Sequence, residues 1–197
     1  RNASGGLSLA TSEAADILDA NGFDLIIFET LGVGQVEIDV INETDTVVVV
    51  LVPESGDDIQ MMKSGLIEIA DLYVVNKSDR QGSSRLVLTL KNMLDTNPSL
   101  EQKKWDIPVL MTNALNGEGI PELIKSIDNH FKYLNEDGYL LQKVNDRYRR
   151  QVRAIINNRY EKYIWKDGNK SAQLEKELSK TIQERLSPIE LADIVLK

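Results

Sequence analysis

Hydrophobic and polar positions follow two different repeats along the first two thirds of the chain. Short apolar runs rich in Val, Ile and Leu predict strands that are buried on both faces of a parallel sheet. These runs occupy residues 23–30, 46–52, 72–75 and 107–111. The segments between them carry apolar residues at helical spacing. We therefore expect helices at residues 8–21, 57–70, 84–95 and 120–134. Alternation of strand and helix is typical of an α/β domain.

The pattern changes near residue 138, after which no strand is predicted. One apolar stripe predicts a long helix over residues 139–165, and a second helix is expected over 171–186 after a turn at 166–169. Ser187-Pro188 is expected to open a third helix, because proline is favoured near a helix start.

A domain boundary is therefore predicted near residues 135–138. It separates an α/β domain at 1–135 from a helical arm at 136–197. A helical arm cannot bury its apolar stripe alone. The stripe must be covered either by the α/β domain or by a partner subunit.

The composition excludes several kinds of site. The 197 residues include no cysteine and a single histidine, His130, so disulfides and Cys-based zinc sites are impossible, and a Ser-His-Asp triad is not expected. The 31 acidic residues outnumber the 23 basic ones, and a formal charge of −8 argues against nucleic-acid binding. No run approaches the ~20 apolar residues of a membrane span, and no signal peptide is visible. We expect a cytoplasmic protein without a membrane partner.

The sharpest local motif is Asn76-Lys77-Ser78-Asp79, directly after an apolar strand. In open parallel sheets, ligands bind beyond the carboxyl ends of the strands. A carboxylate at Asp79 would accept two hydrogen bonds from guanine, at N1 and the exocyclic N2, whereas adenine offers no such donor pair. Alone, the same four residues are also compatible with a polar turn that caps the next helix.

Two further loops follow predicted strands. In residues 112–120, the backbone N–H of Ala114 would donate to guanine O6, and two glycines would permit the turn into the next helix. In residues 29–35, Glu29 would hold Mg²⁺, Gly32 would approach a γ-phosphate and Gln35 would orient a water. Each loop alone is equally an ordinary connection, but their order along the chain is that of a GTPase, and together they favour a GTP site.

The same segments resemble one family, the MeaB/ArgK proteins. These are G-protein chaperones associated with methylmalonyl-CoA mutase, also called LAO/AO transport ATPases or kinases. The resemblance lies in a switch II region with E-T-x-G-x-G-Q, an additional switch III loop, the base-specificity strand and the segment before switch II. In this order, the matching residues are 23–37, 53–65, 69–79 and 1–6.

The resemblance implies an α/β fold of the P-loop NTPase type (a SIMIBI-class GTPase) with a mostly parallel sheet. It implies GTP or GDP and Mg²⁺ as ligands, with Glu29 in the metal shell. It further implies a homodimer formed by the helical arm and an adenosylcobalamin-dependent mutase as client. The implied nucleotide-binding residues are Gly32, Asn76, Lys77, Asp79 and Ala114.

Some of the candidate catalytic residues belong to a loop that would couple nucleotide state to the client. Asp57, Gln60 and Lys63 belong to this loop, although a solvated helix face is the alternative from sequence alone. The complete catalytic set is Glu29, Gln35, Gln60 and Lys63.

Two features depart from the family pattern. Asn113 stands where serine is usual in the base loop, and no G-x-x-x-x-G-K-S/T motif occurs. We therefore expect an N-terminally truncated fragment that hydrolyses GTP negligibly by itself and has an unpaired sheet edge. The alternatives are an ATPase or kinase associated with amino-acid transport and a non-catalytic dimerisation module.

Overall fold

The fold is known from a computed structural model. It describes residues 9–30, 42–53, 66–100, 104–136, 138–166 and 168–196. Contacts divide the chain into two compact units, Arg1–Val144 and Asn145–Lys197, which we call the sheet unit and the helical unit.

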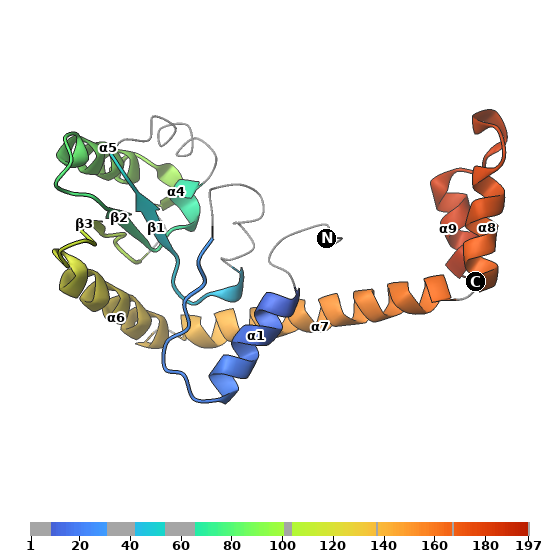
Figure 1. The fold of residues 1–197 in the computed structure, drawn as a ribbon, viewed down its shortest axis with the longest axis horizontal. Coiled ribbons are helices and arrows are strands. Elements are labelled where there is room, and N and C mark those ends of the chain that lie inside the picture. Colours follow the sequence, from blue (N-terminus) through green and yellow to red (C-terminus); the bar gives the residue numbers. More distant parts are fainter. Residues whose placement is uncertain are drawn as a thin grey trace. The chain divides into compact units, whose positions relative to one another are not determined.

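The sheet unit is built on three parallel strands in the order β1-β2-β3 (Figure 1). They are β1 (Val48–Leu51), β2 (Leu72–Val75) and β3 (Val109–Met111). Val48 pairs with Leu72 in the first ladder, and Val75 pairs with Met111 in the second. All four residues of β2 are buried, as expected for the central strand of a parallel sheet. Three of the predicted strands are thus confirmed, within two residues at each end.

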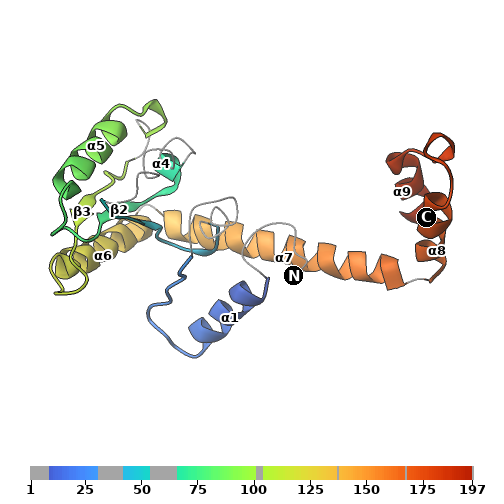
Figure 2. The same cartoon turned by 45° about the horizontal axis from the view of Figure 1, so that its top comes forward.

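Helices cover both faces of this sheet. Figures 1 and 2 show α5 (Ser83–Asp95) on one side of the strands and α6 (Ile120–Glu136) on the other. The unit also contains the shorter helices α1 (Leu9–Ala20) and α4 (Leu66–Ile69) and a 3₁₀ turn at Pro98–Leu100. The predictions for α1, α5 and α6 are confirmed, whereas residues 57–65 of the helix expected at 57–70 lie outside the described residues.

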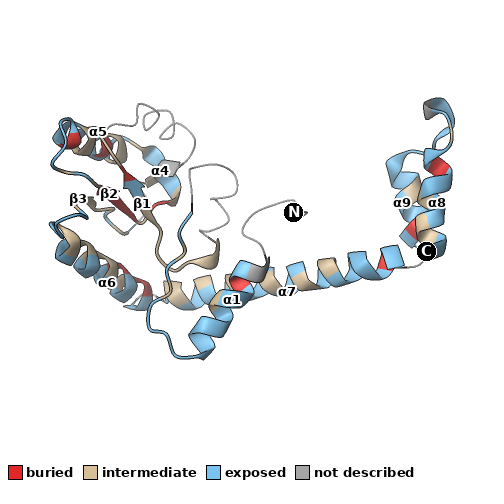
Figure 3. Ribbon diagram, viewed as in Figure 1, coloured by how far each residue is buried: buried red, intermediate tan, exposed pale blue. Residues whose placement is uncertain are grey.

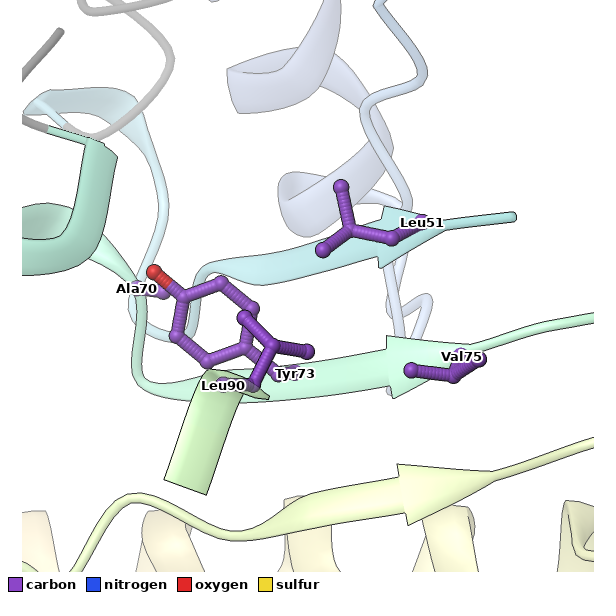
Figure 4. Close-up of a cluster of buried hydrophobic side chains, with 5 residues drawn as sticks. All are labelled: Leu51, Ala70, Tyr73, Val75 and Leu90. Carbon is purple, nitrogen blue, oxygen red and sulfur yellow. The ribbon is translucent and has the colours of Figure 1, made fainter. Parts of the chain in front are cut away.

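The main core lies between α5 and the sheet. Figure 4 shows Leu90 of α5 against the ring of Tyr73, with Ala70, Val75 and Leu51 around them. Leu90 is 1% exposed and Tyr73 is 2% exposed. Burial raises the pKa of the Tyr73 hydroxyl to about 12, because an ionised phenolate would lose its hydration there.

The strand expected at residues 23–30 is absent, which corrects the prediction. This stretch is irregular, and Phe23, Leu25 and Ile27 are 56–80% exposed. β2 already has a neighbour on each side, so a fourth strand would have to pair with an outer edge of β1 or β3. Apolar spacing indicates a tendency to be buried, but it cannot supply the neighbouring backbone that a strand needs. β1 therefore remains an edge strand of the described sheet.

The long helix α7 (Tyr139–Lys166) begins in the sheet unit and continues into the helical unit. The helical unit adds α8 (Gly168–Leu178), a 3₁₀ turn at Ile182–Glu184 and α9 (Pro188–Leu196). The predictions of the long helix and of a helix opening at Ser187-Pro188 are confirmed. The expected turn at 166–169 is too long, because α8 already begins at Gly168.

The predicted helix over 171–186 ends early, at Leu178. Polar contacts turn the following segment back onto α8. The Glu177 carboxylate accepts the Leu186 backbone N–H at 2.7 Å, and the Arg185 guanidinium donates to the Leu178 carbonyl at 2.7 Å. These contacts satisfy the carbonyl and carboxylate at the helix end, and they replace the helical turns that were predicted from composition.

An apolar hollow lies within the helical unit, between the end of α7 and the helices α8 and α9. Its volume is about 580 Å³, and its lining includes Tyr160, Leu174 and Leu191. Ile164 and Val195 line it as well and are 6% and 5% exposed. Figure 3 shows that exposed residues predominate over most of α7.

Candidate guanine-nucleotide site

Two of the predicted loops meet at the carboxyl ends of β2 and β3. The side-chain oxygen of Asn76 accepts hydrogen bonds from the Thr112 hydroxyl at 3.2 Å and from the Ala114 backbone N–H at 3.1 Å. The Ser78 backbone N–H donates to the Thr112 carbonyl at 3.0 Å. The Asn76-Lys77-Ser78-Asp79 motif and the loop around Ala114 therefore lie in direct contact, at the ends of the strands where the sequence analysis expected a shared site.

Lys77 has a backbone conformation that non-glycine residues rarely adopt. Its φ is 56°, in the left-handed region. Such a conformation costs roughly 1–3 kcal/mol and persists where surrounding contacts impose it, often at functional sites. Here the Arg80 N–H donates to the Lys77 carbonyl at 2.9 Å and the Ser83 hydroxyl donates to the Ser78 carbonyl at 2.9 Å. The tight turn leaves Asp79 at the surface with a 54% exposed side chain.

The loop around Ala114 is closed by its own backbone and by Asn113. The Asn113 side-chain oxygen accepts the Leu115 N–H at 3.2 Å, and its carbonyl accepts the Gly117 N–H at 2.9 Å. Gly119 has φ +75°, and a Cβ there would overlap the carbonyl oxygen of Met111. Glycine is therefore required where the loop passes over the end of β3. Asn113, in the position where serine is usual, closes an Asx-type turn.

Thr112 is a site residue that the sequence analysis did not single out. It is 2% exposed and its hydroxyl holds the Asn76 amide oxygen. Its position at the first residue after β3 was the available signal. In this structure the Ala114 N–H donates to Asn76, so the expected contact with guanine O6 would have to share or replace that bond.

Glu29 is not joined to these loops. It lies exposed in the irregular stretch after α1, and the described residues give it no hydrogen bond or ion pair with Asn76 or Ala114. The remaining predicted residues, Gly32, Gln35, Gln60 and Lys63, lie outside the described part of the chain, as does Asp57. The two loops predicted to read the base are in contact, and the roles of all these residues in binding nucleotide stay predictions.

The sequence matches the family model described as methylmalonyl Co-A mutase-associated GTPase MeaB over residues 1–169. The chain belongs to this family. The MeaB match spans the whole sheet unit and all of α7, so it includes the Asn76 and Ala114 loops. The predicted family is thus confirmed, and with it membership among GTPases.

Relatives of the chain carry related names. A Pyrococcus horikoshii protein named as a GTPase is 41% identical over the whole chain, which spans 62% of that protein. The Escherichia coli GTPase ArgK is 33% identical over 70% of the chain and 42% of its own length. The mouse mitochondrial methylmalonic aciduria type A homolog is 30% identical over 98% of the chain and 47% of its own length. The chain spans about three fifths or less of these proteins.

A solved structure confirms the fold. A crystal structure described as an LAO/AO transport system kinase aligns with a TM-score of 0.69 at 23% identity, and the match covers 94% of this chain and 62% of that one. The α/β fold of P-loop GTPases, which the sequence predicted, is therefore the fold of this chain.

The described residues show neither a preformed metal cluster nor a membrane-spanning helix. No group of three or more His, Asp or Glu residues there is placed to hold a metal ion. In the same residues, no helix is long and apolar enough to cross a bilayer. Magnesium commonly binds through one or two carboxylates together with water and nucleotide phosphates. The exposed Glu29 carboxylate suits one such ligand position.

Proposed function

We propose that this chain carries the base-reading part of a GTP-binding, GTP-hydrolysing protein. The supporting observation is the Asn76 side chain, which joins the Ala114 loop to the motif that ends at Asp79. This arrangement leaves the Asp79 carboxylate half exposed at the strand ends, where it would accept from guanine N1 and N2. Lys77 would cover the base or ribose with its aliphatic stem.

Hydrolysis would use the residues that were predicted to act on the phosphates and the metal ion. In this proposal Glu29 holds Mg²⁺, which would neutralise charge on the phosphates, while Gly32 senses the γ-phosphate and Gln35 orients the attacking water. Gln60 and Lys63 would couple nucleotide state to a client. Since the sequence contains no G-x-x-x-x-G-K-S/T motif, we expect hydrolysis only from a polypeptide that supplies a phosphate-binding loop.

Exchanging the base acceptor tests the proposed base reading. Asp79→Asn should weaken GDP binding by the penalty of an unpaired polar group, roughly 1–3 kcal/mol or about 5- to 150-fold. The new amide would donate to the 2-oxygen of xanthine, so xanthosine diphosphate should bind the variant better than the wild type. Fluorescent-nucleotide titration of the full-length protein measures both affinities, and Asp95→Asn is the exposed control. Tighter binding of ATP than GTP by the wild type would favour the ATPase or kinase alternative.

The proposed partners are a second copy of the chain and a mutase. On α7, Tyr148, Val152, Ile156 and Tyr160 recur every four residues and are 36–68% exposed, which suits a helix-to-helix contact. Ile156→Asp should convert a dimer to a monomer in light scattering, whereas Ala154→Asp, at another exposed position of α7, should leave it dimeric. A monomeric wild type would exclude the homodimer.

The client role rests on the family description alone. We propose that nucleotide state gates cobalamin loading and protection of an adenosylcobalamin-dependent methylmalonyl-CoA mutase. GTP hydrolysis by the full-length protein should change when this mutase is added, and Lys63→Ala should abolish that change while nucleotide affinity stays the same. Identical hydrolysis with and without the mutase would contradict the client assignment.

A further inference from the structure

Asp71, the residue immediately before β2, is contacted from four other segments of the sheet unit. Its carboxylate accepts the Val47 backbone N–H at 2.9 Å, and its carbonyl accepts the Trp105 indole N–H at 2.9 Å. Nε2 of His130 on α6 lies 3.5 Å from one carboxylate oxygen, and Nζ of Lys143 on α7 lies 3.8 Å from the other. The Asp71 side chain thus links the approach to β1, α6 and the start of α7, and its backbone carbonyl adds the approach to β3.

Both helical partners of Asp71 make a second contact to the segment before β1. The buried His130 ring, 2% exposed, forms a 2.8 Å hydrogen bond between Nδ1 and the Thr46 hydroxyl. Lys143 Nζ donates to the Asp45 carbonyl at 2.6 Å. The start of α7 therefore contacts the segments before β1 and β2 at the same place.

Aromatic rings cover one side of this junction. The ring centroids of Trp105 and His130 are 4.8 Å apart, and those of Trp105 and Tyr133 are 5.3 Å apart. Tyr139, the first residue of α7, continues the series at 5.4 Å from Tyr133. Apolar cover limits water access and strengthens the charged contacts beneath it. Asp71 itself is 18% exposed.

The junction and the base-reading loop occupy opposite ends of the same strand. Asp71 precedes β2 and Asn76 follows it, a separation of roughly 16 Å at about 3.3 Å per residue. β2 is buried throughout and paired on both sides, so it has little freedom to bend. A shift at the Asn76 end would therefore reach Asp71 as a movement of the whole strand.

We propose that Asp71 is a positioning residue that fixes the start of α7, residues 139–144, to β2 and makes it respond to nucleotide bound at the other end of the strand. The fixing depends only on the contacts described above. The response rests on the proposed guanine-nucleotide site. His130 and Lys143 act through Asp71, each holding one of its carboxylate oxygens.

Hydrogen exchange of the nucleotide-free, full-length protein tests the fixing. Asp71→Asn keeps the size and the backbone carbonyl that Trp105 uses, but it removes the charge that faces Lys143. The amides of residues 142–144 should then exchange about 3- to 10-fold faster. Lys143→Met should have the same effect, and Lys143→Arg should exchange like the wild type. Asp95→Asn and Lys132→Met are exposed controls on α5 and α6. Unchanged exchange at 142–144 in both Asp71→Asn and Lys143→Met would overturn the fixing.

Adding GDP and Mg²⁺ tests the response. In the wild type, nucleotide should slow exchange at residues 142–144 at least twofold. In Asp71→Asn this difference should disappear, while GDP affinity stays within threefold of the wild type, which a merely structural loss would not produce. Normal GDP binding without any change at 142–144, or a nucleotide effect that persists in Asp71→Asn, would overturn the response alone. Failure of the wild type to bind GDP would instead overturn the proposed site and the response together, with the fixing decided separately by the nucleotide-free measurement.

Discussion

Each of the two units is stabilised by its own internal contacts, and these contacts differ in sequence range between the units. In the sheet unit, Tyr73 and Leu90 pack across strands and helices that are separated by many residues, and the central strand is wholly buried. In the helical unit, side-chain hydrogen bonds mostly join residues fewer than ten positions apart, as between Glu177 and Leu186. The comparison teaches that core volume should control the stability of the first unit, whereas helix caps and charges should control that of the second.

The largest expected effect comes from the core of the sheet unit. Leu90→Ala should lower its free energy of unfolding by about 3 kcal/mol, because truncation leaves a cavity beside Tyr73. Urea denaturation followed by Trp105 fluorescence in a Trp165→Phe background measures this unit separately. Leu88→Ala on the same helix is the control, since Leu88 is 61% exposed. Equal losses for the two variants would show that this core does not dominate.

The next effect separates a special backbone conformation from a steric overlap. Gly117 and Gly119 both have positive φ, but only at Gly119 would a Cβ meet backbone atoms. Gly117→Ala should cost about 1–2 kcal/mol from its left-handed conformation alone. Gly119→Ala should cost about 1–3 kcal/mol more, because the loop must move away from Met111. The same fluorescence assay measures both variants, and indistinguishable losses would contradict the close approach.

The sequence predictions were accurate where the pattern of nearby residues determines the structure, and they failed where a distant neighbour determines it. β2 was predicted to the residue because a fully buried central strand reads as a continuous apolar run. Residues 23–30 carry a similar run and form no strand, since pairing depends on a neighbour that apolar spacing cannot reveal. Asn76 and Ala114 were expected at the same edge of the sheet because they follow parallel strands, and a hydrogen bond joins them there. The role of Thr112 was missed, since a threonine after a strand has no distinctive pattern.

A smaller effect is expected from the cap of α9. The Ser187 hydroxyl accepts the Glu190 N–H at 3.2 Å, and the Glu190 carboxylate accepts the Ser187 N–H at 3.0 Å, which together form a capping box. Ser187→Ala should destabilise α9 by about 1 kcal/mol. Hydrogen exchange of residues 191–196 should accelerate accordingly, while α5 in the sheet unit stays unchanged. Ser187→Thr retains the hydroxyl and should restore most of the protection; equal exchange for Ala and Thr would exclude the cap.

The smallest effect concerns the Glu177 carboxylate, which lies where the chain turns back after α8. The Lys180 ammonium, followed by the Leu186 N–H, lowers the pKa of Glu177 below its ordinary value of 4.5. A carboxyl group whose pKa is lowered in the folded state stabilises the fold at pH values above its ordinary pKa. This contribution disappears as the pH falls through the folded-state pKa. As the pH falls below 4.5, NMR signals of α8 and α9 should therefore lose their native positions before those of the buried sheet. In Glu177→Gln these positions should depend less steeply on pH, because the remaining acid sensitivity comes from groups such as Glu190, whose pKa the Ser187 contacts also lower. Glu175→Gln, at an exposed position of the same helix, is the matched control. If the helical unit instead keeps its signals at pH 3 as well as the sheet unit does, then short-range charged contacts do not hold it together, and the contrast between the two units is wrong.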